Sequence, residues 1–129
     1  YKHLYEGLDL TIKKSIKYLR TQFKKYDTFY IHLKETDIPG HDGFPKHKVK
    51  MLEIIDRDFI SKLRKFKAQI AITCDHTTPC DRKRHTYHPV PLLIYGKGAD
   101  KTERFTEQEC RTGSLGRIKG KDLMKLLQK

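Results

Sequence analysis

Apolar residues recur at helical spacing in two long stretches of this chain, and short runs of β-branched and aromatic residues separate them. In the first stretch, steps of three or four residues predict an amphipathic helix from about Leu8 to Lys25, based on Leu8, Ile12, Ile16, Leu19 and Phe23. The second stretch predicts a helix from about Lys46 to Phe66, with an inward face made of Val49, Leu52, Ile55, Phe59 and Leu63. This alternation limits the chain to folds in which helices pack against another layer.

The intervening runs are short and apolar, as in buried strands. We expect strands at Thr28–Leu33, Gln69–Thr73 and Pro91–Tyr95, all in one sheet, and a short helix near the end of the sequence. A length of 129 residues suits one ordinary domain, which we assign to residues 1–129. The sequence therefore predicts an α/β fold with a sheet flanked by helices.

Basic residues outnumber acidic ones, and the formal net charge is +12. This balance favours an anionic partner, such as a phosphorylated molecule, nucleic acid or a membrane surface, without choosing among them. The cysteines Cys74, Cys80 and Cys110 are odd in number and show no C-x-x-C pair, so we expect neither a disulfide framework nor a cysteine zinc site. The chain has no apolar run that could span a bilayer and begins YKHLYEGLDL, without a signal peptide, so we expect a cytoplasmic protein with no membrane partner.

Two polar clusters directly follow predicted strands. Asp37 to His41 comes after the first strand, and Asp75 to His88 comes after the second. Open α/β sheets collect their ligands at such positions, beyond the C-terminal ends of the strands. Carboxylate and imidazole groups are donors that suit zinc or manganese, and a pair of such ions can serve hydrolysis or group transfer. The clusters therefore predict a metal-dependent enzyme.

Each of these residues also has a simpler interpretation. Asp37 could cap the turn at Pro39 and Gly40, and Asp75 could cap whatever follows its strand, because aspartate favours both roles. A histidine in a basic loop is often only solvated or hydrogen-bonded. The combined pattern favours metal binding: D-x-x-x-H after one strand, D-H after the next, and H-x-x-x-P-V-P before the third.

The segments HLKETDIPGHDG, TCDHTTPC and HTYHPVPLLIYG, followed by FTEQECRTGSLGRIKGKDLMKLL, are similar to a known family. In order, they resemble the C-terminal portion of the archaeal-type, cofactor-independent phosphoglycerate mutases of the alkaline phosphatase superfamily. The resemblance covers nearly the whole chain and implies part of an alkaline-phosphatase-like fold. In that family the T-D-x-x-G-H-D-G and H-x-x-x-P-V-P motifs hold one metal ion, which implies Asp37, His41 and His85 here. The D-H-x-T-P motif helps to hold a second ion, which implies Asp75 and His76.

Other polar residues near the implied ligands have less certain roles. We prefer His85 to His88 as a ligand because His85 occupies the motif position. Lys34 and Arg84, together with Arg82 and Lys83, flank the ligands and could neutralise a substrate phosphate or carboxylate. A solvated basic loop explains these cations equally well.

The resemblance also implies an activity. Members of the family are metal-dependent isomerases that interconvert 3-phosphoglycerate and 2-phosphoglycerate through a phosphoserine intermediate, in glycolysis and gluconeogenesis. This implies two divalent ions (manganese, zinc or magnesium), no 2,3-bisphosphoglycerate, and a phosphorylated three-carbon acid as substrate. Full-length members are longer, and their N-terminal part supplies the serine nucleophile and an aspartate ligand. We find neither motif in this chain, so we assign no catalytic residue, and a separate N-terminal segment could be a partner.

Two other interpretations stay open. Another phosphatase or phosphodiesterase of the same superfamily would share the metal ligands, and only the GHDG and GSLGRIKG segments favour the mutase. A basic nucleic-acid-binding module is suggested by the net charge and by the aromatic residues among lysines in IKYLRTQFKKYDTFY. We rank this module last and expect no nucleic acid partner, because the spacing is typical of an amphipathic helix whose aromatic residues point inward.

Overall fold

Two structural units make up residues 1–128, which are the residues described by the computed structural model. The first unit comprises Tyr1–Phe66 and Thr78–His85, and the second comprises Lys67–Thr77 and the chain from Thr86 onward. Lys129, the last residue of the predicted domain, lies outside the described residues. Helices make up most of the first unit, and the second contains a sheet, so the chain is a mixed α/β protein, as predicted.

Helix α1 (Lys2–Gln22) confirms the first predicted helix and begins earlier than expected. Its buried residues are Leu8, Ile12, Ile16 and Leu19, so the apolar spacing does mark the inward face. The last apolar residue of the pattern, Phe23, lies just beyond the helix and contacts Phe66, with ring centroids 5.1 Å apart. The apolar stripe of α1 therefore forms one wall of the core of the first unit.

Residues 28–33 are extended but are not a strand of the sheet, so this prediction is wrong. Burial alternates along the segment: Ile31 and Leu33 pack against the core, whereas Tyr30 is 84% exposed. Such alternation is typical of a strand with one covered face. Within residues 1–128, however, no backbone hydrogen bond joins Phe29, Tyr30 or Ile31 to another segment. The apolar pattern predicts the extended conformation, but a sheet strand also needs a neighbouring backbone to pair with.

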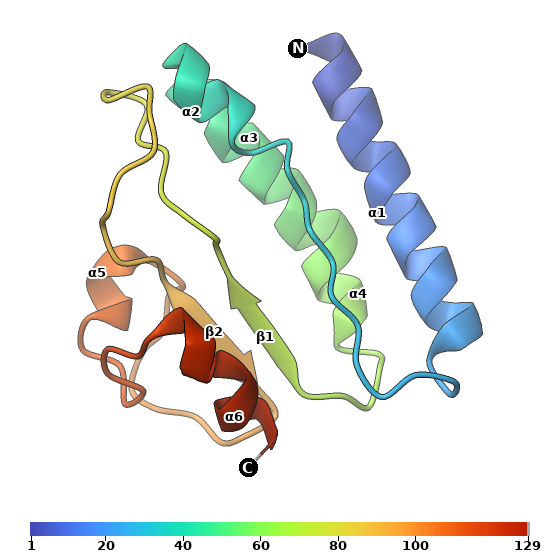
Figure 1. Cartoon of the computed structure of the whole chain (residues 1–129). Helices are drawn as coiled ribbons and strands as arrows, with labels where there is room; N and C mark the ends of the chain where they lie inside the picture. Colours follow the sequence, from blue (N-terminus) through green and yellow to red (C-terminus); the bar gives the residue numbers. More distant parts are fainter. Residues whose placement is uncertain (129) are drawn as a thin grey trace. The chain divides into compact units, whose positions relative to one another are not determined.

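The second predicted helix consists of three successive segments. These are α3 (Pro45–Ile55), a π-helical turn η1 (Asp56–Ile60) and α4 (Ser61–Leu63). A short helix, α2 (Ile38–Asp42), precedes them. Figure 1 shows α1 and α3 running side by side, with the extended residues 28–33 returning along them. After this extended segment, the chain enters α2 at one end of the first unit.

The inward face of this second helix differs from the prediction. Met51 and Phe59 are 0% and 4% exposed, whereas Val49 and Leu52 are 54% and 52% exposed. Met51, Ile55 and Phe59 recur at steps of four residues, which lie along one stripe of a helix, as Leu8, Ile12 and Ile16 do in α1. Val49 and Leu52 are therefore wrong as core residues, while the partly buried residues around the core include two others of the predicted face, Ile55 and Leu63.

The second unit contains a two-stranded antiparallel sheet of β1 (Ile70–Thr73) and β2 (Leu92–Tyr95). Ile70 pairs with Tyr95 and Thr73 pairs with Leu92. These strands confirm two of the three predicted runs. Three short helical segments follow, namely α5 (Glu107–Cys110), η2 (Gly120–Asp122) and the predicted terminal helix α6 (Leu123–Gln128). In the described part of the chain, no helix combines the length and the hydropathy that crossing a bilayer requires.

Candidate metal centre

Asp37 and His41 lie at the two ends of one short helix of the first unit. The extended residues 28–33 lead towards α2, where Asp37 occupies the N-cap position and Pro39 lies in the first turn. Proline fits there because its ring presets the helical backbone angle. The Asp37 side chain makes no cap hydrogen bond, so it does not have the simpler role of a capping group. A spacing of four residues places Asp37 and His41 on the same face of this helical turn.

The loop Thr78–His85 places His85 beside α2, close to Asp37 and His41. Backbone N–H groups of Arg82 and Lys83 donate to the Pro79 carbonyl and close a turn. Lys83 ends the turn with a φ of 52°, a left-handed conformation that residues other than glycine rarely adopt. Gly43 ends α2 with a φ of 77°, in the left-handed region that favours glycine. The Lys83 side chain lies directly beside it.

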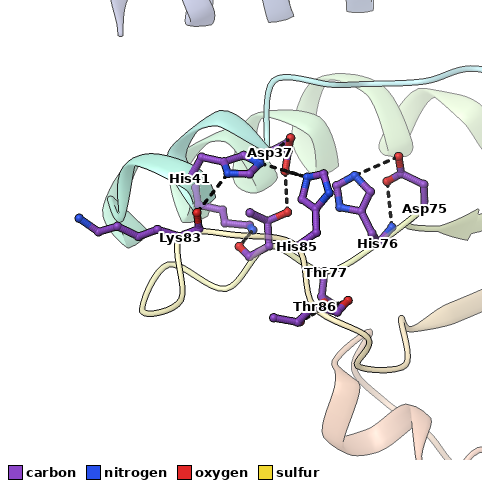
Figure 2. Close-up of polar contacts among 10 residues, drawn as sticks. Asp37, His41, Asp75, His76, Thr77, Lys83, His85 and Thr86 are labelled. Carbon is purple, nitrogen blue, oxygen red and sulfur yellow. Dashed lines mark hydrogen bonds and ion pairs between the residues drawn. The ribbon is translucent and has the colours of Figure 1, made fainter.

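Asp37, His41 and His85 converge, as Figure 2 shows. The Nε2 atoms of His41 and His85 are 3.0 Å apart. Asp37 faces both rings, with Oδ2 3.4 Å from Nε2 of His41 and Oδ1 3.7 Å from Nε2 of His85. Asp37 is partly buried, whereas the two imidazole groups are more exposed. The structure therefore brings together the three residues that the resemblance assigns to one metal ion.

These separations suit a metal ion. Zinc bonds to histidine nitrogen and to carboxylate oxygen are about 2.0–2.1 Å long, which puts ligand atoms in a tetrahedral site roughly 3.3 Å apart. The three observed separations lie between 3.0 and 3.7 Å. Imidazole and carboxylate donors also suit manganese. Three protein ligands leave a coordination position for water or substrate, which is the pattern of catalytic rather than structural sites.

A hydrogen bond outside the cluster sets the tautomer of His41. Its Nδ1 atom lies 3.2 Å from the backbone carbonyl oxygen of Lys83. Because a carbonyl can only accept, Nδ1 carries the proton, and neutral His41 keeps a lone pair on Nε2. Histidines that bind metals commonly have their second nitrogen held in this way. His41 is therefore oriented to act as a ligand through Nε2, the atom that faces Asp37 and His85.

Asp75 and His76 lie in the second unit, directly after β1 and one intervening residue. The backbone N–H of His76 donates to Oδ1 of Asp75 at 3.0 Å, and Nε2 of His76 lies 3.4 Å from Oδ2. A bend rather than a helix follows β1, so Asp75 is not a helix cap. Figure 2 shows the two side chains facing each other. They form a carboxylate–imidazole pair, and their role as ligands of a second metal ion stays a prediction.

The other sequence-predicted residues occupy exposed positions. Lys34 and Arg84 are exposed in the first unit, and their role in binding substrate stays a prediction. His88 lies in the second unit, where its Nδ1 atom is 2.8 Å from the hydroxyl oxygen of Thr86. The Thr86 hydroxyl thus gives His88 a local partner within its own unit.

Two residues of the site were not expected from the sequence. Thr78 donates a 2.6 Å hydrogen bond from its hydroxyl to Oδ1 of Asp37. The D-H-x-T-P motif contains this threonine and could have indicated it. Lys83 acts through its backbone carbonyl on His41, and no side-chain pattern reveals a backbone contact. The sequence therefore indicates the ligands better than the groups that support them.

Comparison with known proteins finds similar sequences over most of this chain. A family model described as the metalloenzyme superfamily matches residues 8–129. A probable 2,3-bisphosphoglycerate-independent phosphoglycerate mutase from Thermosipho melanesiensis is 41% identical over 118 residues, covering 90% of this chain and 29% of the relative. The 2,3-bisphosphoglycerate-independent phosphoglycerate mutase from Thermococcus gammatolerans is 44% identical over 120 residues, covering 89% of this chain and 28% of the relative.

A solved structure of a protein from Pyrococcus horikoshii is similar in fold and in sequence. It matches with a TM-score of 0.83 at 40% identity, covering 92% of this chain and 37% of that chain. The chain spans less than a third of the length of the curated relatives it matches. The similarity therefore extends over most of this chain but over only a portion of each relative, as the motifs predict.

Proposed function

Because this chain belongs to the metalloenzyme superfamily, we propose that it is the C-terminal portion of a metal-dependent, 2,3-bisphosphoglycerate-independent phosphoglycerate mutase. The complete enzyme would be a cytoplasmic isomerase that interconverts 3-phosphoglycerate and 2-phosphoglycerate in glycolysis and gluconeogenesis. The observation that carries the proposal is the convergence of Asp37, His41 and His85, which come from two separate motifs and have the separations of metal ligands. The names of the similar mutases support it.

Asp37, His41 and His85 would hold one divalent ion, for which manganese, zinc and magnesium are the candidates. Such an ion supplies a Lewis acid that neutralises charge on a phosphoryl oxygen. The Asp37 carboxylate offsets part of the ion's charge, and the exposed sides of the two histidines leave the site open to a phosphorylated three-carbon acid. The Lys83 carbonyl keeps the His41 proton on Nδ1, away from the ligating nitrogen.

The remaining chemistry is divided between this chain and the rest of the enzyme. Asp75 and His76 would help to hold a second ion, whose other ligands include the serine nucleophile and an aspartate from elsewhere in the protein. Lys34 and Arg84 would neutralise the phosphate or carboxylate of the substrate. No 2,3-bisphosphoglycerate is needed, because the phosphoserine itself carries the phosphoryl group between the two hydroxyls of glycerate.

A chimera tests the proposal. This chain would replace the matching 120 residues of the Thermococcus gammatolerans relative, so that the relative supplies the missing groups. With manganese and no added 2,3-bisphosphoglycerate, the chimera should convert 3-phosphoglycerate to 2-phosphoglycerate in an enolase-coupled assay. His41→Ala should abolish the conversion. The matched control is His88→Ala, which removes a histidine of the H-x-x-x-P-V-P segment that is not an implied ligand.

The same assay distinguishes the mutase from another phosphatase or phosphodiesterase of the superfamily. Release of inorganic phosphate with little isomerisation would support the metal site and reject the mutase assignment. Full activity of the His41→Ala chimera would reject the metal site itself. Activity that appears only with added 2,3-bisphosphoglycerate would reject the phosphoserine route.

A further inference from the structure

We propose that Thr78 positions the metal ligand Asp37 and that Lys48, on α3, holds Thr78 in place for this task. The inference deepens the proposed function and rests on it, because it concerns the orientation of one ligand of the metal site. Thr78 is a positioning residue in this proposal, since it acts through Asp37 and does not touch the substrate.

Thr78 is buried, with 4% of its surface exposed, although it carries a polar hydroxyl group. The hydroxyl donates a 2.6 Å hydrogen bond to Oδ1 of Asp37. An oxygen–oxygen distance this short is typical of a bond to an ionised carboxylate, which is stronger than a bond between neutral groups. The same Oδ1 atom faces His85, while Oδ2 faces His41. The hydroxyl therefore sets the rotation of the carboxylate and determines which oxygen faces each histidine.

The backbone of Thr78 is held from two sides. The ammonium group of Lys48 donates a 2.7 Å hydrogen bond to the Thr78 carbonyl oxygen. On the α2 side, the approach is so close that a Cβ atom on Gly40 would lie 2.5 Å from that same oxygen. The carbonyl thus lies between α2 and α3. These contacts hold the Thr78 backbone in a position from which its hydroxyl reaches Asp37.

The orientation of the Asp37 carboxylate matters because its two oxygens face different histidines. Its side chain makes no cap hydrogen bond to α2. The last torsion of an aspartate side chain has broad minima, so an unsupported carboxylate rotates easily. Hydrogen bonds that orient metal ligands from outside the ligand set typically contribute about 10–100-fold to metal affinity or activity. We therefore expect an effect of this size from Thr78.

The first test measures manganese binding by the full 129-residue chain, with MnCl2 in a titration calorimeter. Thr78→Val keeps the shape of the side chain but removes the hydroxyl, so it should weaken binding by about 10-fold or more. Thr78→Ser restores the hydroxyl and should recover most of the affinity. Lys48→Met keeps much of the apolar stem of lysine and should weaken binding as well. Lys46→Met is the matched control for Lys48→Met. Lys46 lies in the same helix but is exposed, so this substitution should leave the manganese affinity unchanged.

A second readout needs no metal. In the metal-free chain, long-range 1H–15N NMR spectra report the protonation and surroundings of the ring nitrogens of His41 and His85. Thr78→Val should shift these resonances because the carboxylate that faces both rings is no longer held. Thr78→Ser should leave them close to those of the parent chain. A change in stability alone would not produce this difference, because both variants are compared in the folded state.

The outcomes separate this inference from the proposed function. If Thr78→Val and Lys48→Met bind manganese as tightly as the parent, and the histidine resonances are unchanged, the positioning role is wrong while the metal site stands. If the parent chain binds no manganese but the resonances still respond to Thr78→Val and not to Thr78→Ser, the positioning of Asp37 is supported and the proposed function loses its main observation.

Discussion

The Nε2 atoms of His41 and His85 lie 3.0 Å apart, although 44 positions separate the two residues in sequence. A hydrogen bond between two nitrogens needs one donor and one acceptor. Because the Lys83 carbonyl fixes the His41 proton on Nδ1, His85 must donate from Nε2 when both rings are neutral. A neutral imidazole has one lone pair, so binding an ion through both Nε2 atoms requires His85 to carry its proton on Nδ1, as His41 does. The two Nε2 atoms are then close enough to be ligands of one ion.

The chain should bind about one manganese or zinc ion, because three expected ligands of one ion converge in its first unit. Titration calorimetry should give a stoichiometry near one. His85→Ala removes an expected ligand, so it should weaken binding by more than the loss of about 10–100-fold that is typical of changes outside the ligand set. His88→Ala should leave the affinity unchanged.

The cysteines provide the control for this first prediction. Thiolates are alternative ligands for such ions, so replacing both Cys74 and Cys80 with serine should leave manganese and zinc binding intact. Loss of binding in this double variant would move the site to the cysteines. If the folded parent chain bound neither ion, the assignment of Asp37, His41 and His85 as ligands would be wrong.

Gly40→Ala should damage both the fold and the metal site. An added Cβ would lie 2.5 Å from the Thr78 carbonyl oxygen and 3.0 Å from the Thr78 Cβ atom, so α2 and the loop that carries His85 must separate. We expect a destabilisation of about 1–3 kcal/mol, as for other overpacked sites. Urea unfolding followed by circular dichroism measures it, and manganese titration should show weaker binding.

A matched glycine controls the Gly40 experiment. Gly120→Ala adds the same methyl group where nothing lies within 4 Å, so its effect should stay within about 0.5 kcal/mol, as is usual at the surface. Equal destabilisation by the two substitutions would mean that backbone flexibility, rather than the contact with Thr78, determines the result.

Met51→Ala and Val49→Ala test which face of α3 is buried. Met51 is 0% exposed, so its truncation should cost about 2–5 kcal/mol in the free energy of unfolding. Val49 is 54% exposed, so its truncation should stay within about 0.5 kcal/mol. Ile55→Ala should fall between them, because Ile55 is only partly buried. Chemical denaturation checks the order, and a larger loss for Val49 than for Met51 would contradict the observed packing.

The elements that local sequence determines were predictable, and the errors concern contacts between distant residues. The stripe of α1 follows directly from apolar spacing, since a helix makes its hydrogen bonds within one segment. Residues 28–33 carry a strand pattern, but pairing depends on a second backbone that their own sequence does not specify. Met51 lies on a stripe with Ile55 and Phe59, but Val49 and Leu52 also stand at helical spacing, so only tertiary packing determines which of these residues is buried.

The candidate site shows the same contrast between what local sequence indicates and what contacts between distant residues determine. Asp37, His41 and His85 could be expected to lie together because their motifs resemble those of a family that binds metal ions. Their supporting groups are harder to predict, because almost any backbone carbonyl can accept from His41 and only the fold places that of Lys83 there. Side-chain chemistry is therefore visible in sequence, whereas the geometry that orients it comes from tertiary packing.

Asp100 should stay ionised to unusually low pH. Hydrogen bonds from the Thr102 hydroxyl, the Ser114 N–H and the Thr102 N–H hold the pKa of its carboxyl group well below the ordinary value. Because the folded pKa is lowered, the stabilisation is present above about pH 3.9, the ordinary value for aspartate, and is lost as the pH falls through the folded pKa. The Ser114 amide resonance, which reports the charge on Asp100, should therefore change only at a pH below about 3.9.

The Asp100→Asn variant is the control for this titration. It keeps an acceptor oxygen but has no group that ionises, so the acid-induced change of the Ser114 resonance should disappear. A parent midpoint at or above about pH 3.9, the ordinary value, would show that the hydrogen bonds to Asp100 do not favour its charged form.

Asp75→Asn should separate the roles of the two proposed metal ions. In this chain alone, Asp37, His41 and His85 suffice for one ion, whereas the second ion lacks the aspartate and serine expected from the rest of the enzyme. The substitution removes the negative charge of Asp75, so it should abolish mutase activity of the chimera in the enolase-coupled assay. It should leave the stoichiometry and affinity of manganese binding by the chain alone unchanged. His41→Ala, in contrast, should remove both the mutase activity of the chimera and the manganese binding of the chain alone. If Asp75→Asn eliminated the single ion bound by the chain, Asp75 would be a ligand of that first ion, and the division of the ligands into two sites would be wrong.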